Sequence, residues 1–317
     1  MEEHGDVRAV LRDAGLPESD GEGARGSHAR FPDGAAYRIE IPSTEGVSAT
    51  RAVLAAADEH GVRIDRISQG SGIFMCTDAE LDELAAIGAA EEVEVCLFTG
   101  PRAAWDTGRS VLSAGGAVQG ASLRGISGLA AGIDDVIRAC EHGIRSVLVA
   151  DLGQLRLLAR MRSAGDVPAD LILKTSVSIA PTNPATARLL EDLGADTINA
   201  STDLTIEQLG SMREAVDVPL DVYVEVPDDF GGSVRHHEVA AIVRACAPVY
   251  LKFGLRNLQV LYPSGAHLEA VAVAAARERV RRAAIGLTYL ARHGGAGGPA
   301  AGAAAGATSN RGGAGRQ

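Results

Sequence analysis

The stretch that decides the fold is residues 171–201, LILKTSVSIAPTNPATARLLEDLGADTINAS. It begins with a β-rich run over 171–177, continues through a turn into an Ala/Leu-rich helical stretch, and ends in a second β-rich run over 197–201. Gly194 follows the helical stretch, where glycine is favoured because it adopts the left-handed backbone without strain. A strand, a helix and a second strand in this order predict a βαβ unit with parallel strands.

The same unit repeats along the chain. Thr77 with Glu80, and Thr205 with Gln208, have the spacing of capping boxes that begin helices between β-rich runs. Eight such units predict a closed (β/α)8 TIM barrel of parallel strands rather than an open doubly wound sheet. The eight runs are residues 37–42, 64–69, 93–99, 146–151, 171–177, 197–201, 221–226 and 249–254.

One connection is unusually long. Within residues 100–132, the segment 118–123 could be a ninth strand that displaces one of the eight, or part of a loop over the barrel mouth. The sequence does not decide between these two interpretations.

The two ends of the chain differ from its middle in composition. Residues 1–35 join a short helical piece to a Gly/Ser/Glu-rich stretch, which predicts a flexible, loosely attached arm. Residues 294–317 are rich in Gly and Ala without periodicity, and such a segment cannot bury enough apolar surface to order itself. We therefore expect a TIM-barrel domain over residues 36–293, between a flexible arm and a disordered tail.

Composition narrows the class of partner. The net charge of −11, with no dense basic block before residue 277, argues against nucleic acid as the main partner. No apolar run approaches the ~20 residues of a membrane span. We expect a small polar or anionic substrate, and the sequence leaves open whether copies of the chain form a homo-oligomer.

The cysteines indicate a reducing compartment. All four are far apart in sequence, so no CxxC metal or redox pair exists, and the N-terminus lacks the pattern of a secretion signal. We therefore predict buried free thiols, a cytoplasmic location, and neither an iron–sulfur cluster nor a structural zinc; other cofactors stay unknown. His236 and His237 are adjacent rather than four residues apart, so no metal ligands are predicted.

Polar residues alternate with apolar ones along the runs. Successive strand residues point to opposite faces, so the apolar set must face the helices and the polar set the barrel lumen. Arg66 and Ser68 are candidates to join that inward set. Its predicted members are Glu40, Lys174, Ser176, Asn199, Tyr223, Glu225 and Lys252. Because buried charges are costly unless paired, this set predicts either a site that serves a ligand or a salt-bridge network that only holds the barrel.

Each residue type suggests a role. Lys174 and Lys252 are candidate bases or Schiff-base nucleophiles, and Glu225 or Glu40 could act as a general base or hold a lysine charged. Ser176, Asn199 and Tyr223 can orient a polar substrate.

The loops after the last two runs could hold an anion. Gly231, Gly232 and Ser233 are expected to precede a helix, whose free N–H groups favour negative charge, and Arg235 lies nearby. The second loop supplies Arg256.

Residues 144–257 resemble Peptidase family U32, a group of collagenase-like barrel proteins. The resemblance is carried by SVLVADLGQLRLL (146–158), LKTSVSIAPTNPATARLLEDLGADTINASTDLTIEQL (173–209) and YLKFGLRN (250–257). It aligns five positions with family positions: Asp151, Ser176, Asn183, Lys252 and Arg256. The chain departs from the family where VYVEVPDDFGG (222–232) replaces a His-Gly element with cysteines, and where Gly254 replaces a glutamate.

Three functions follow as hypotheses. The resemblance implies a hydrolase acting on a peptide or related small polar substrate, with Lys252, Glu225, Lys174 and Glu40 as catalytic candidates. The alternatives are a lyase or aldolase-type enzyme that forms a Schiff base with a small carbonyl acid, and a non-catalytic barrel that binds a small ligand.

Overall fold

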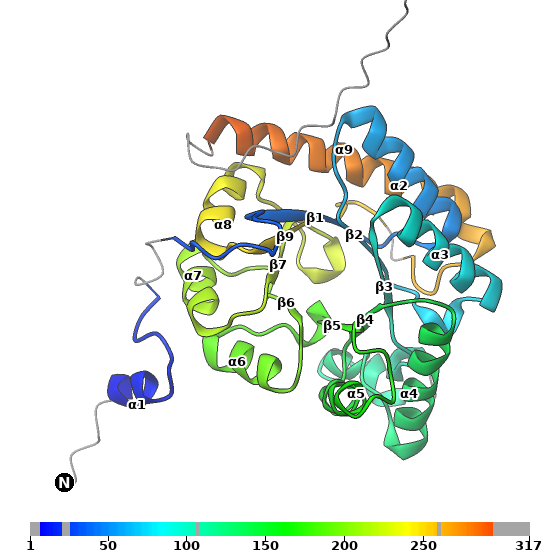
Figure 1. The fold of residues 1–317 in the computed structure, drawn as a ribbon, viewed down its shortest axis with the longest axis horizontal. Coiled ribbons are helices and arrows are strands. Elements are labelled where there is room, and N and C mark those ends of the chain that lie inside the picture. The colour runs from blue at the N-terminus through cyan, green and yellow to red at the C-terminus, as the bar shows by residue number, and fades with distance from the viewer. Residues whose placement is uncertain (1–6, 21–25, 106–107, 259–260, 294–317) are drawn as a thin grey trace, which may run out of the picture.

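The chain folds into a closed barrel. The computed structural model describes residues 7–20, 26–105, 108–258 and 261–293. Within these residues, eight parallel strands pair in chain order, and β9 (Val249–Phe253) closes the ring by pairing with both β7 (Leu220–Val226) and β1 (Tyr37–Pro42) (Figure 1). The other barrel strands are β2 (Arg66–Gln69), β3 (Glu94–Phe98), β4 (Ser146–Val149), β5 (Ile172–Thr175) and β6 (Thr197–Asn199). The predicted (β/α)8 fold is confirmed, and each predicted run overlaps a strand.

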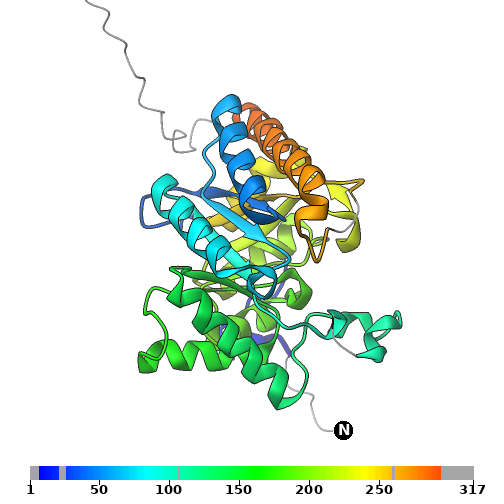
Figure 2. The same ribbon diagram turned by 90° about the vertical axis from the view of Figure 1, so that its right-hand side faces the viewer.

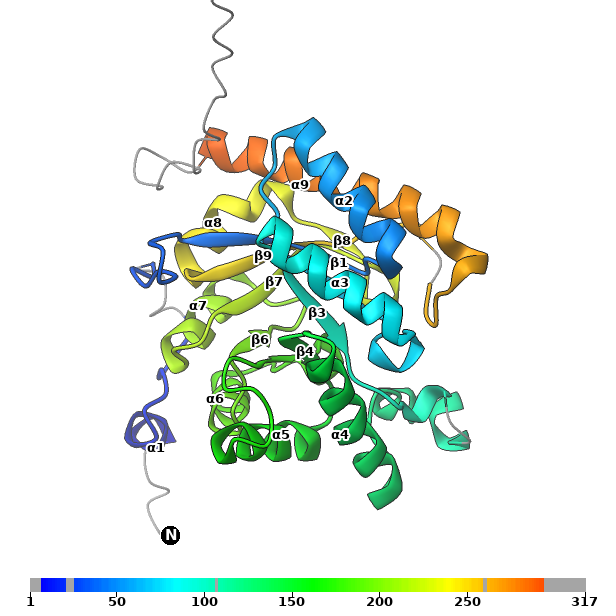
Figure 3. The ribbon, with the colours of Figure 1, turned by 45° about the vertical axis from the view of Figure 1, so that its right-hand side comes forward.

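Helices surround the strands, as Figures 1 and 3 show. Both predicted capping boxes are present, Thr77 with Glu80 and Thr205 with Gln208, and Gly61 and Gly194 follow their helices with positive φ angles of 63° and 104°. The helices that cover the barrel are α2 (Gly46–His60), α3 (Asp78–Glu91), α4 (Gly125–Glu141), α5 (Leu152–Ala164), α6 (Pro184–Asp192), α7 (Ile206–Ala215), α8 (Val239–Cys246) and α9 (Glu269–His293). None of the described helices is both long and apolar enough to cross a bilayer.

The main core lies between the strands and the helices. Ile39, Leu173, Val222 and Leu251 are buried there, on the outward face of their strands, as the alternation predicts. The inward face instead carries charged and polar side chains, so the apolar core lies mainly outside the barrel lumen.

The long connection after β3 forms an extension rather than a strand. The described part of residues 100–124 contains three short 3-10 helices, η3 (Ala103–Trp105), η4 (Arg109–Leu112) and η5 (Ala117–Gln119). The extension projects from the barrel (Figure 2) and returns on itself, because Ala103 N donates to Ser122 O at 3.0 Å and Ala104 N to Gly120 O at 2.9 Å. Of the two interpretations of residues 118–123, the structure therefore supports the loop.

Part of the predicted N-terminal arm contacts the barrel. Beyond the short helix α1 (Val7–Asp13), Ser27 N donates to Arg244 O at 2.7 Å, and Phe31 is buried with its ring centroid 5.2 Å from that of Tyr250. One aromatic side chain thus anchors an otherwise polar segment. The tail predicted over residues 294–317 lies outside the described residues.

Candidate functional site

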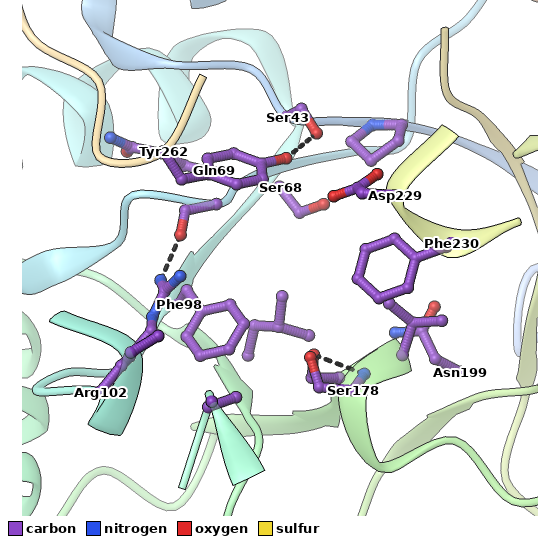
Figure 4. A pocket seen from close by; sticks show the side chains of 18 of the residues that line it. Ser43, Ser68, Gln69, Phe98, Arg102, Ser178, Asn199, Asp229, Phe230 and Tyr262 are labelled. Atoms are coloured by element: carbon purple, nitrogen blue, oxygen red, sulfur yellow. Dashed lines mark hydrogen bonds between the residues drawn. The ribbon is translucent and has the colours of Figure 1, made fainter. Parts of the chain in front are cut away.

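A cavity of about 540 Å³ lies at the carboxyl ends of the barrel strands. Residues at or next to the ends of β1, β2, β3, β6 and β9 contribute to its walls, and the extension after β3 covers one side. Figure 4 shows side chains from several elements pointing into this space. The lining includes polar residues (Ser43, Ser68, Gln69, Arg102, Ser176, Ser178, Asn199, Tyr223, Asp229, Lys252 and Tyr262) and apolar ones (Phe98, Trp105, Leu148 and Phe230). Its size suits a small-molecule ligand.

Lys252 lies on the floor of the cavity. Its ammonium donates to Asn199 Oδ1, lies 3.5 Å from Glu40 Oε1, and is 4.2 Å from the ring centroid of Tyr223. An ammonium group has three N–H donors. Among the described residues, Asn199 Oδ1 is its one hydrogen-bond acceptor and Glu40 lies at ion-pair distance, so the ammonium retains donor capacity for a ligand.

Beneath the cavity, Glu40 is the centre of a buried ion-pair cluster. Its carboxylate pairs with Lys174, lies 3.3 Å from Arg66 Nη1, and accepts a 2.7 Å hydrogen bond from Ser68 Oγ. Burial alone would raise the pKa of Glu40, but the neighbouring charges of Lys174, Lys252 and Arg66 hold that pKa far below its ordinary value. Glu40 therefore remains a carboxylate, which argues against its acting as a proton acceptor.

Asp221 completes this cluster. Its carboxylate lies 3.2 Å from Arg66 Nη1 and 3.3 Å from Lys174 Nζ, and it accepts a 2.6 Å hydrogen bond from Thr197 Oγ1. Arg66 Nε also lies 2.8 Å from Glu94 Oε1. The alternation that places Tyr223 inward also places Asp221 inward, two residues earlier, so the same signal could have identified it.

Lys174 and Lys252, the two lysines in the 317-residue sequence, therefore differ in position. Lys174 is fully buried between Glu40 and Asp221 and does not line the cavity, whereas Lys252 does. Of the other predicted site residues, Ser176, Asn199 and Tyr223 line the cavity. The inward set is thus divided: Glu40 and Lys174 belong to the buried ion-pair cluster, whereas Ser176, Asn199, Tyr223 and Lys252 line the cavity.

Glu225 does not lie in the lumen, and its predicted inward position is wrong. Tyr223 is in register with Lys252, but Glu225 is in register with Phe253, so β7 holds one extra residue there. Such a bulge reverses the direction of every side chain that follows. The Glu225 carboxylate consequently lies on the helix side, 3.7 Å from His236 Nε2 and 3.8 Å from Arg282 Nε.

The loops after β7 and β9 are also built differently from the prediction. Ser233 begins β8 (Ser233–Val234), which is antiparallel to β7, and not a helix, so no helix N-terminus is available at the Gly-Gly-Ser segment. Arg235 pairs with Glu238 at 2.6 Å, and Arg256 with Asp228 at 2.7 Å. Neither arginine lines the cavity: Arg235 pairs with a carboxylate of its own loop, and Arg256 pairs across to a carboxylate of the loop after β7.

Two residues aligned with the U32 family cap helices. Asp151 accepts hydrogen bonds from Gln154 N at 3.0 Å and Leu123 N at 3.2 Å, and so joins the start of α5 to the extension. Asn183 accepts from Thr186 N at 2.9 Å at the start of α6. Within the described residues, no group of three or more His, Cys, Asp or Glu side chains is placed to bind a metal ion.

Asp229 was missed as a site residue, because its sequence context, PDDFGG, is that of a turn. It lies in the short helix η7 (Asp228–Phe230), and Figure 4 shows Asp229 and Phe230 beside the cavity. Burial, and then the charge of Asp228, raise the pKa of Asp229 above its ordinary value. A carboxylate with a raised pKa is a better proton acceptor.

The fold and the cavity together define a (β/α)8-barrel protein with a small-molecule-sized site at the carboxyl ends of its strands. Residues 129–225 of the chain match the family model of Peptidase family U32. The resemblance to this family is therefore confirmed over that segment, which holds Lys174, Ser176, Asn199 and Tyr223 and ends before Lys252.

Several solved structures resemble the fold at low identity. The U32 peptidase Mk0906 is 19% identical with a TM-score of 0.40, over 63% of this chain and 74% of that one. The YdjI aldolase from Escherichia coli K12 is 16% identical with a TM-score of 0.47, over 87% and 94% of the two chains. No curated protein sequence gives a significant match. Likenesses of this degree carry no information on activity.

Proposed function

We propose that the chain is an enzyme that hydrolyses an amide or related acyl bond in a small polar substrate bound in the cavity. The observation that carries this proposal is the position of Lys252, whose ammonium reaches the cavity floor and has one hydrogen-bond acceptor, Asn199 Oδ1, among the described residues. A fixed positive charge of this kind stabilises the oxyanion that forms when a carbonyl is attacked.

The proposed reaction uses groups that face the same cavity. Asp229 accepts a proton from water, the water oxygen bonds to the carbonyl carbon, and Lys252 stabilises the developing oxyanion. When the C–N bond breaks, the leaving amine takes the proton from Asp229. Ser176 and Ser178 supply hydroxyl groups that orient the substrate.

The Schiff-base alternative has less support from the geometry. A lysine must be neutral to attack a carbonyl carbon. The carboxylate of Glu40 and the amide oxygen of Asn199 both stabilise the charged form of Lys252. Borohydride treatment in the presence of small carbonyl acids tests the alternative, because a reduced adduct on Lys252 would favour it over hydrolysis.

A turnover screen tests the proposal. Purified chain is incubated with N-acyl amino acids and short peptides, and released amine is detected by mass spectrometry. Lys252→Met is expected to lower kcat/KM by about a hundredfold or more, the usual cost of losing an oxyanion donor. Arg160→Met, an exposed cation on α5, serves as the matched control with unchanged turnover. Binding without turnover across the screen would favour the non-catalytic alternative.

We further propose a cytoplasmic location. Its support is that the four cysteines are free and that burial raises the pKa of the Cys96 and Cys246 thiols to about 12, which keeps them protonated.

A further inference from the structure

A second cation in the cavity wall has no role in the proposed hydrolysis. Arg102 lies in the segment that leaves β3, and it lines the cavity although only 8% of the residue is exposed. Its guanidinium carbon is 3.6 Å from the ring centroid of Phe98 and 4.1 Å from that of Trp105. The two aromatic rings therefore fix the position of the guanidinium group.

The polar contacts of Arg102 leave its charge without an anion. Nη2 donates to the carbonyl oxygens of Gly70 and Ser71, and Nε is buried with no hydrogen-bond partner among the described residues. Glu45 is the carboxyl group that most stabilises the charge of Arg102. Its oxygens, however, accept hydrogen bonds from Gly70 N at 2.6 Å and Ser71 N at 3.0 Å.

Two other buried arginines, Arg66 and Arg213, have clear structural roles. A further one, Arg279, also has no ion pair among the described residues, but it donates to Ser43 O at 3.0 Å and does not line the cavity. Arg66 is surrounded by carboxylates in the cluster beneath the cavity. Arg213 donates to the carbonyl oxygens of Val216 and Val218 just after α7 ends. Arg102 differs because it combines burial, a missing ion-pair partner among the described residues and a position on the cavity wall.

A guanidinium group removed from water is costly unless an anion compensates it. Burial lowers the pKa of Arg102 to about 10, so it is still charged at neutral pH and retains the need for an anion. The planar array of N–H donors matches the two oxygens of a carboxylate, and aromatic stacking of the guanidinium is typical of such recognition sites.

We infer that Arg102 binds a carboxylate group of the substrate, so that the site takes an N-acyl amino acid or the C-terminal residue of a short peptide. This inference rests on the proposed function for the identity of the acyl bond, but the carboxylate contact stands on Arg102 alone. Figure 4 shows Arg102 and Asn199, the partner of Lys252, on opposite sides of the cavity. The substrate carboxylate lies at Arg102, its acyl carbonyl lies near Lys252, and Phe98 and Phe230 contact its apolar parts.

Binding measurements with matched ligands test the inference independently of turnover. N-acetyl amino acids are titrated into the full chain, each paired with its uncharged amide, and binding is measured by calorimetry. Trp105 is the single tryptophan of the sequence and lies beside Arg102, so its fluorescence reports ligand binding at the same place. We expect the best acids to bind about tenfold to a hundredfold more tightly than their amides, as for a hydrogen bond to a charged group.

The variants separate this inference from the proposed function. Arg102→Met should abolish the preference for acid over amide, Arg102→Lys should retain part of it, and Arg109→Met, an exposed cation of the same extension, should leave it unchanged. Lys252→Met should lower turnover as stated above and keep the preference.

Three outcomes would overturn the inference: no acid binds more tightly than its amide in the wild-type chain, the preference survives in Arg102→Met, or inorganic phosphate displaces the acids at equal concentration. The wild-type comparison needs no variant, so a failure of Arg102→Met to fold would leave the test intact. If the acids bind as predicted but none of the acyl bonds is cleaved, the proposed function fails and the carboxylate site stands.

Discussion

Replacing Glu40 with glutamine should destabilise the barrel substantially. The substitution keeps the size of the side chain and an oxygen that can accept from Ser68 Oγ, but it removes the negative charge that faces Lys174, Arg66 and Lys252. Removing one partner of a buried ion pair costs about 3–5 kcal/mol. Asp221 still compensates Lys174 and Arg66, so we expect a loss near the lower end, about 3 kcal/mol in the free energy of unfolding. That corresponds to a decrease in Tm of roughly 6–12 °C.

Urea unfolding at neutral pH, followed by circular dichroism, measures this loss. Glu83→Gln, on the exposed side of α3, is the matched control and should leave the unfolding midpoint unchanged. The folded-state pKa of Glu40 is depressed from its ordinary 4.5, so its contribution is complete above that pH and is lost as the pH falls below it. The gap between wild type and Glu40→Gln should therefore narrow only below about pH 4.5. A loss under about 1 kcal/mol would refute the view that Glu40 compensates these three cations.

Three further substitutions test local features. Burial raises the pKa of Asp135 to about 6, so the ionised carboxyl group destabilises the folded chain increasingly as the pH rises from 3.8 through 6. Urea unfolding should therefore show that Asp135→Asn is more stable than wild type by about 1–3 kcal/mol at pH 8 and equally stable at pH 4. Gly72→Ala should lose about 2–4 kcal/mol, because the new Cβ would lie 2.1 Å from Phe98 O at a φ of 81°; an unchanged thermal midpoint would contradict this. Thr205→Ala should lose about 1 kcal/mol with the α7 capping box, whereas Thr205→Ser should retain most of it.

The barrel could be predicted from the sequence because the same pattern of alternating apolar and polar residues recurs in successive strands. Each strand carries a two-residue alternation, and the outward members, such as Leu173 and Leu251, had to face the helices. The same alternation of side-chain direction predicted that Lys174, Asn199 and Lys252 face one lumen.

Predictions from this alternation failed where the backbone departs from a regular strand. Nothing in VYVEVPDD indicates the extra residue in β7, so the direction of Glu225 could not be predicted. Ion pairs between residues far apart in the sequence could not be predicted either. The alternation could not reveal that Lys174 closes an internal cluster while Lys252 faces the cavity, because that difference depends on how deep each side chain lies.

The cavity walls were the least predictable part. Arg102 and Asp229 come from irregular segments, where no periodicity relates one side chain to another. Their positions follow from how the extension and the β7 loop fold back over the mouth.

The location of a bound ligand tests the central claim most directly. A crystal structure of the chain with the N-acetyl amino acid that it binds most tightly should show that ligand in the cavity, its carboxylate at Arg102 and its acyl oxygen at the Lys252 ammonium. Ligand bound instead at the loops that carry Arg235 and Arg256, with the cavity holding only water, would contradict the account.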